Sequence, residues 1–225
     1  MKQVTARSKS PTNLPIVLLT GFNAFGGDAL NPSWLAVQAL HGGVLHGHHI
    51  FAAQLPTTFA GSKQVLLKLL RKHKPALVVC VGLAGGRPAI SLERIAINVQ
   101  DARIADNVGD QPVDAPVAKS GPAAYFSNLP IKAMLQSLTA AGIDAEVSQT
   151  AGTFVCNHVF YVLMHAIKKH RNQSNVRGGF VHVPYLPQQG EPSMPLEEMV
   201  RGLRLAVSCA LVTKQDALTG AGALS

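Results

Sequence analysis

The sequence is poor in charged residues, in aromatic side chains and in long apolar runs. Charged residues make up 14% and aromatic residues 5% of its 225 residues, whereas apolar residues make up 47%. Wholesale disorder is excluded, because enough apolar surface is present to build a sizeable core. No apolar run reaches the roughly 20 residues that a membrane-spanning helix needs. The composition therefore predicts a folded domain, and the length does not require a second one.

Cysteine is also scarce. Cys80, Cys156 and Cys209 are odd in number and widely spaced, so they do not resemble a disulfide framework. Free thiols suit a reducing compartment, and we therefore expect a cytoplasmic protein.

Acidic residues are fewer than basic ones, 12 against 20, which gives a formal net charge of +8. Such an excess can indicate a nucleic-acid partner. The basic residues are scattered, however, and the densest cluster, "LLRKHK" around Arg71, is typical of the solvated end of a helix. Zinc-finger spacing and aromatic RNA-binding motifs are absent, so we do not expect nucleic-acid binding.

Short apolar runs alternate with longer amphipathic stretches. The runs predict buried strands at 16–20, 50–55, 76–82, 95–99, 145–149 and 179–183. Helical periodicity predicts helices at 32–40, 58–72, 130–141, 156–169 and 195–212. This alternation predicts an α/β fold, a three-layer α/β/α sandwich around a twisted, mostly parallel, mixed sheet. We expect one domain at 15–213, a disordered basic tail at 1–14 and a flexible C-terminal tail at 214–225.

Ligands of such folds bind beyond the carboxyl ends of the strands. Phe22 and Phe25 stand there, in the Gly-rich turn "GFNAFGG" after the first predicted strand. They either pack under the turn as core or line an apolar slot for a flat ring. The later turn "GLAGGR" is a weak candidate for a phosphate cradle, because no Walker lysine follows it.

Cys156 stands where a polar segment changes into an apolar helix. It is either a small buried hydrophobe or a nucleophile whose thiolate is favoured by the helix N-terminus, which lowers a thiol pKa. His182 lies on the opposite strand face from its two flanking valines and is either structural or a general base. His158 is the nearest rival histidine. An imidazole base needs an orienting carboxylate, and Glu93 and Asp106 are the candidates.

At these residues the sequence resembles pyroglutamyl peptidase type I, the pyrrolidone-carboxylate peptidase family of cysteine exopeptidases. The resemblance spans about 16–212, nearly the whole chain beyond the N-terminal stretch. It rests on four motifs that are highly specific together: "LLTGFNAFGGDALNPSW", "GGRPAISLERIAINVQDARIADN", "GTFVCNHVFY" and "GGFVHVPYLP".

The resemblance implies that Cys156 is the nucleophile, His182 the general base and Glu93 its orienting residue, with Asp106 as the alternative to Glu93. Arg103 and the backbone N–H of Cys156 would face the oxyanion. The residues implied for the substrate pocket are Phe22, Phe25, Asn31, Thr57, Leu83, Phe154 and Val155.

The implied activity is removal of N-terminal pyroglutamate from peptides through a thioester. The resemblance also implies a cytosolic catalytic domain without metal or cofactor that forms a homo-oligomer, a dimer or a tetramer. Two alternatives stay open: another cysteine amidase-type acyl transfer on the same fold, or a non-catalytic protein that binds an anionic ligand.

One position departs from the family. The family usually reads "GQAGGR", whereas this sequence has Leu83 in place of the glutamine. A contact through the backbone carbonyl would survive this change, whereas a pocket organised by the side-chain amide would lose affinity. Losing one hydrogen bond to a buried polar group costs about 1–3 kcal/mol. We expect the change to affect efficiency rather than the reaction type.

Overall fold

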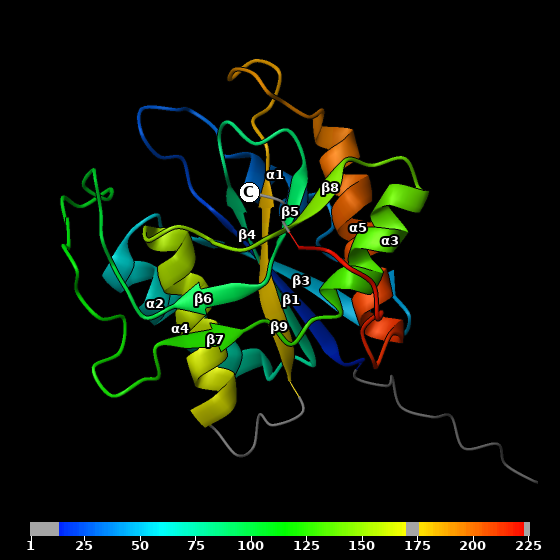
Figure 1. The fold of residues 1–225 in the computed structure, drawn as a ribbon, viewed down its shortest axis with the longest axis horizontal. Coiled ribbons are helices and arrows are strands. Elements are labelled where there is room, and N and C mark those ends of the chain that lie inside the picture. The colour runs from blue at the N-terminus through cyan, green and yellow to red at the C-terminus, as the bar shows by residue number, and fades with distance from the viewer. Residues whose placement is uncertain (1–13, 170–175, 223–225) are drawn as a thin grey trace, which may run out of the picture.

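The computed structural model describes residues 14–169 and 176–222 (Figure 1). These residues form a seven-stranded sheet in the order β2-β3-β1-β4-β9-β5-β8. Its strands are β1 (Ile16–Phe22), β2 (Val44–Leu45), β3 (His48–Leu55), β4 (Leu77–Leu83), β5 (Ile90–Glu93), β8 (Ala145–Ser148) and β9 (Arg177–Val183). Pairing is parallel except between β2 and β3 and between β5 and β9. The predicted mixed, mostly parallel sheet is confirmed.

Helices cover both faces of this sheet (Figure 1). The helices are α1 (Pro32–Gln38), α2 (Phe59–His73), α3 (Ile131–Ala140), α4 (Val155–Lys169) and α5 (Leu196–Val212). Successive side chains of a strand point to opposite faces, so Val79 and Val181 pack with α1, α3 and α5, whereas Val78 and Phe180 pack with α2 and α4. The result is the α/β/α sandwich that the sequence predicts.

The strand expected from Ile95 does not join the main sheet. It forms β6 (Ile95–Ile97), which pairs with β7 (Ala124–Phe126) in a separate two-stranded sheet. Its place in the main sheet is taken by β5, a four-residue strand that the apolar pattern did not indicate. The reason is that β5 alternates apolar residues with Ser91 and Glu93, and both of these polar residues are fully buried.

The direction of β5 matters for the site. The chain leaves β4 at Leu83 and returns at Ile90, a connection too short for the helical crossover that a parallel neighbour requires. β5 therefore runs antiparallel to β9, with Ser91 opposite His182 and Glu93 opposite Phe180. Glu93 and His182 are thus diagonal neighbours on one face of the sheet, within reach of long side chains.

Part of the predicted C-terminal tail packs against the rest of the protein. The Asp216 carboxylate accepts hydrogen bonds from the backbone N–H groups of Lys132 and Ala133 at the start of α3. The carbonyl of Ala221 accepts a hydrogen bond from Arg94. The predicted N-terminal tail lies outside the described residues apart from Leu14. Across the described part of the chain, each helix is too short or too polar to cross a bilayer.

Candidate active site

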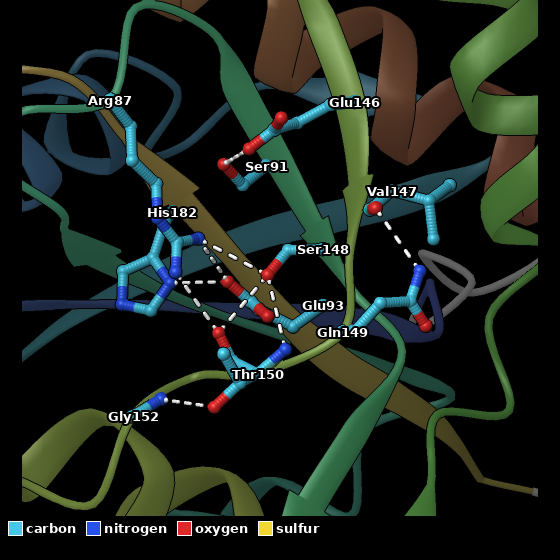
Figure 2. A network of polar contacts seen from close by, with 10 residues as sticks. All are labelled: Arg87, Ser91, Glu93, Glu146, Val147, Ser148, Gln149, Thr150, Gly152 and His182. Atoms are coloured by element: carbon cyan, nitrogen blue, oxygen red, sulfur yellow. Dashed lines mark hydrogen bonds and ion pairs between the residues drawn. The ribbon is translucent and has the colours of Figure 1, made fainter. Parts of the chain in front are cut away.

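Glu93 and His182 form a buried hydrogen-bonded pair. His182 Nδ1 lies 2.7 Å from Glu93 Oε1, and the two residues are 4% and 0% exposed (Figure 2). A carboxylate accepts only, so the proton of this bond is on Nδ1. The bond therefore selects the tautomer in which Nε2 carries a lone pair and is able to accept a proton.

Cys156 is the second residue of α4 and lies against the sheet at Gly82. A Cβ on residue 82 would be only 2.8 Å from Cys156 Sγ and 2.9 Å from the ring of Phe180. Glycine at this position is what allows the sulfur to approach the strand so closely. Gly82 is also the partner of His182 in the β4–β9 ladder, and parallel neighbours lie about 4.8 Å apart. The register thus places the Cys156 thiol next to the position of His182 on β9.

The pKa of the Cys156 thiol is raised to about 12: burial is the largest cause, the negative charge of Glu93 adds to it, and the positive charge of Arg87 partly opposes both. Any lowering of this pKa by the helix N-terminus is therefore outweighed in the resting protein, because burial and the neighbouring carboxylate dominate. At neutral pH the sulfur is protonated. Nucleophilic attack by Cys156 requires a base that removes this proton.

A cavity of about 260 Å³ opens beside the thiol. Cys156 lines it together with all the residues predicted for the substrate pocket: Phe22, Phe25, Asn31, Thr57, Leu83, Phe154 and Val155. Gly26, Asp28, Leu30 and Tyr185 complete the wall. The fold therefore brings to one place residues from three of the four motifs, together with Thr57 and Leu83.

The aromatic residues form the apolar part of the cavity wall. The rings of Phe25 and Phe154 lie 5.2 Å apart between centroids, and Phe154 also packs edge-on against Phe59. Phe22 is only 2% exposed and belongs to the core as well as to the cavity. For Phe22, core packing and a place in the cavity are therefore compatible.

The predicted polar pocket residues hold the surrounding loops. Asn31 caps α1 by accepting hydrogen bonds from the backbone N–H and the hydroxyl of Ser33. The amide group of Asn31 and the hydroxyl of Thr57 both donate to the carbonyl of Asn23. These bonds join the turn after β1 to the segment before α2, so the two sides of the cavity have a defined separation.

Asp106 does not contact His182. Its carboxylate accepts hydrogen bonds from the backbone N–H groups of Phe59, Val108 and Asp110, and Phe59 is the first residue of α2. Burial acts to raise the pKa of Asp106, but the backbone donors outweigh it and lower the pKa overall. Of the two candidate carboxylates, the structure brings Glu93 to the histidine, and Asp106 caps a helix.

Two other predicted residues lie apart from the thiol. Arg103 is exposed and lines a separate cavity, which shares only Phe154 with the cavity beside Cys156. His158 packs edge-on against Phe59, and burial together with the charge of Lys63 lowers its pKa to about 4. His158 thus faces α2, whereas His182 is the histidine at the carboxyl ends of the strands.

The sequence interpretation missed Arg87 and Tyr185. Arg87 Nη1 lies 2.8 Å from Glu93 Oε1, so the arginine of "GLAGGR" contacts the carboxylate rather than serving the phosphate cradle considered for this turn (Figure 2). Tyr185 follows β9 and lines the cavity. Among the residues that the structure describes, no group of three or more His, Cys, Asp or Glu side chains is arranged to hold a metal ion.

Comparison with known proteins identifies the family. The family model described as pyroglutamyl peptidase matches residues 16–213. The chain belongs to the pyroglutamyl peptidase family. A pyrrolidone-carboxylate peptidase of Cupriavidus taiwanensis is 54% identical over 216 residues, which cover 94% of this chain and 100% of the relative. The resemblance inferred from the four motifs is thereby confirmed.

Solved structures of pyroglutamyl peptidases share the fold. The crystal structure of pyroglutamyl peptidase I from Bacillus amyloliquefaciens matches with a TM-score of 0.89 at 46% identity and covers 92% of this chain and 100% of its own. Pyrrolidone carboxyl peptidase from Thermococcus litoralis matches with a TM-score of 0.85 at 35% identity and covers 88% of this chain and 94% of its own.

The cap formed by Asp106 predicts a pH-dependent loss of stability. Asp106→Ala should lower the free energy of unfolding by about 1–2 kcal/mol at pH 7, because the start of α2 loses its acceptor. Folding lowers the pKa of Asp106, so its contribution is present above the unfolded pKa of about 3.9 and is lost as pH falls through the folded pKa. Urea unfolding of wild type and variant at pH 7 and at pH 3 measures both values.

The matched control is Asp144→Ala, since Asp144 is an exposed aspartate in the turn before β8. Its free energy of unfolding should change by no more than about 0.5 kcal/mol. A stability difference for Asp106→Ala that is equally large at both pH values would contradict the assignment of the carboxylate as the cap.

Proposed function

We propose that this protein is a cysteine exopeptidase that removes N-terminal pyroglutamate from peptides, with Cys156 as nucleophile, His182 as general base and Glu93 as its orienting carboxylate. The observation that carries the proposal is the buried 2.7 Å contact between Glu93 and His182, beside a thiol that packs on the strand partner of that histidine. Membership of the pyroglutamyl peptidase family supports the choice of reaction.

The cavity fits the substrate class. An N-terminal pyroglutamyl residue is a closed lactam without an ammonium group, so a site for it needs apolar walls around a flat ring and few polar contacts. The pair formed by Phe25 and Phe154 supplies such walls. A volume of about 260 Å³ suits one small ring next to Cys156 rather than a long side chain.

Attack on the substrate begins with proton transfer. Because burial keeps the Cys156 thiol protonated, His182 Nε2 takes the proton as Sγ bonds to the pyroglutamyl carbonyl carbon. Negative charge develops on the carbonyl oxygen, where the backbone N–H of Cys156 is a donor, since the first N–H groups of a helix have no partner within it. Glu93 stabilises the imidazolium that forms.

The tetrahedral intermediate then collapses. The bond to the leaving nitrogen breaks, and His182 returns its proton to that nitrogen, so that a shortened peptide leaves and a thioester remains on Cys156. Water attacks the thioester with His182 again as base. The carbon–sulfur bond breaks, pyroglutamate is released and the thiol regains its proton.

The remaining expectations are part of this proposal. Arg103 as an oxyanion donor stays a prediction, because in the structure it lines a neighbouring cavity. We also propose a cytoplasmic homo-oligomer that needs no cofactor, with 15–213 as its single catalytic domain. The three free cysteines of the described chain agree with a reducing compartment.

Hydrolysis of a pyroglutamyl fluorogenic amide tests the proposed function, with the matching prolyl amide as substrate control. Wild type under reducing conditions should cleave only the lactam substrate. Cys156→Ala should lower kcat by more than about 10⁴-fold, because the nucleophile and base act as a unit. Cys209→Ala is the matched control, since Cys209 lies on α5, on the opposite side of the sheet, and it should retain activity.

Folded wild type that cleaves neither amide would overturn the proposal. Cleavage that survives Cys156→Ala would overturn the assignment of the nucleophile.

Leu83→Gln tests the departure from the family. Leu83 is the last residue of β4 and lines the cavity, so we expect its apolar side chain to serve as a wall and the substrate contact to run through the backbone. Restoring glutamine should therefore change KM less than about tenfold and leave kcat within about twofold, because a single hydrogen bond contributes about 1 kcal/mol net. A hundredfold fall in KM would show instead that the side-chain amide organises this pocket.

A further inference from the structure

We propose that Arg87 is a positioning residue of the catalytic centre: it holds the Glu93 carboxylate in place for His182 and compensates its charge. The proposal rests on the proposed function, in which Glu93 orients the base. It concerns a residue for which the sequence suggested no part in catalysis.

The guanidinium of Arg87 is held by three acceptors, one on β5 and two at the end of β8 and just beyond it (Figure 2). Nη1 donates to Glu93 Oε1 at 2.8 Å and to the hydroxyl of Ser148 at 3.2 Å, and Nη2 donates to the carbonyl of Thr150 at 3.0 Å. Ser148 also donates to the carbonyl of Thr150, which closes the network. An arginine fork with this many partners has little freedom to rotate, so the position of Glu93 is set by β8 as well as by its own strand.

The buried carboxylate of Glu93 needs a positively charged partner. One of its oxygens, Oε1, receives both Arg87 and His182, and Oε2 has no hydrogen-bond partner within the described residues. An ionised carboxylate that is fully buried is costly unless it is paired. The Arg87 guanidinium is permanently charged and lies 2.8 Å from Oε1, so Arg87 is the cation that balances Glu93.

The backbone of "GLAGGR" is shaped to deliver this side chain. A Cβ on Gly85 would lie 2.2 Å from the Tyr185 ring, so any larger residue here would displace that tyrosine. Gly86 has a φ of 84°, in the left-handed region that favours glycine. Arg87 follows directly and turns back over the end of β5. Gly85 thus has a steric role and Gly86 a conformational one, and neither needs a phosphate.

Other ionisable groups near the thiol do not replace Arg87. Cys156 faces Glu93 of β5 and Cys80 of β4, and both act to raise the pKa of its thiol, whereas Arg87 acts to lower it. Glu146 on β8 is engaged by the hydroxyl of Ser91. Removing the charge of Arg87 would leave Glu93 uncompensated beside both Cys156 and His182, and both would hold their protons more tightly.

The test compares wild type, Arg87→Gln and Arg87→Lys over a range of pH. Activity is measured as kcat/KM on the pyroglutamyl amide, and the thiol is followed separately by the rate of Cys156 alkylation with iodoacetamide. Arg87→Gln should lower kcat/KM about 10–100-fold, as is usual when a group supporting a functional side chain is lost. The acid limb of the kcat/KM profile should move up by about one pH unit, and the alkylation rate should fall about tenfold at a fixed pH, because a compensating charge is lost.

Arg87→Lys separates charge from geometry. Lysine keeps the positive charge but not the planar fork, so the acid limb should return toward the wild-type position while the plateau of kcat/KM stays below wild type. Arg94→Gln is the matched control, since Arg94 carries the same charge but bonds to Gln149 and not to Glu93. Its profiles should follow wild type.

Two outcomes would overturn the proposal. One is an acid limb that stays in place or moves to lower pH in folded Arg87→Gln. The other is an Arg87→Lys variant whose kcat/KM plateau and acid limb both equal those of wild type. This second outcome also decides the question if Arg87→Gln does not fold. Wild type that cleaves no pyroglutamyl amide would count against the proposed function instead, and the alkylation profiles would still report on Arg87.

Discussion

The hydrogen bond between the buried carboxylate of Glu93 and the imidazole of His182 is the contact on which the candidate site depends. It depends on the antiparallel register of β5 against β9, which makes the two residues diagonal neighbours on one face. It also requires a cation beside the carboxylate, which Arg87 supplies. The short return from β4 sets the direction of β5, the polar residues of β5 supply the carboxylate, and the two glycines before Arg87 allow its side chain to reach it.

Burial has opposite effects on the base, His182, and on the nucleophile, Cys156. It makes the Glu93–His182 bond stronger, since fewer water molecules compete for it. The same burial raises the pKa of Cys156 to about 12, so the thiol is protected from ionisation until a base removes its proton. A thiol of this kind is a weak nucleophile at rest. His182 therefore activates Cys156 at the moment of attack in the proposed mechanism, and no preformed thiolate is needed.

Much of this could be predicted from the sequence, and the failures have physical causes. The α/β/α sandwich follows from apolar periodicity, and Phe25, Phe154 and Cys156 meet because strand ends gather at one edge. β5 was missed because its buried polar residues mimic a solvated segment. Choosing between Glu93 and Asp106 required strand register, which spacing along the chain does not contain. The role of Arg87 also depends on strand register, because its partners lie on β5, at the end of β8 and just after β8.

The most direct test of the central claim is a crystal structure of the protein with a pyroglutamyl aldehyde. A cysteine sulfur attacks the carbonyl carbon of an aldehyde and forms a covalent adduct. The adduct holds the pyroglutamyl ring at the site of attack. We expect a covalent bond to Cys156 Sγ, the lactam ring packed against Phe25 and Phe154, and His182 Nε2 facing the reacting sulfur. An aldehyde that binds without a bond to Cys156, or a ring that lies outside this cavity, would contradict the central claim.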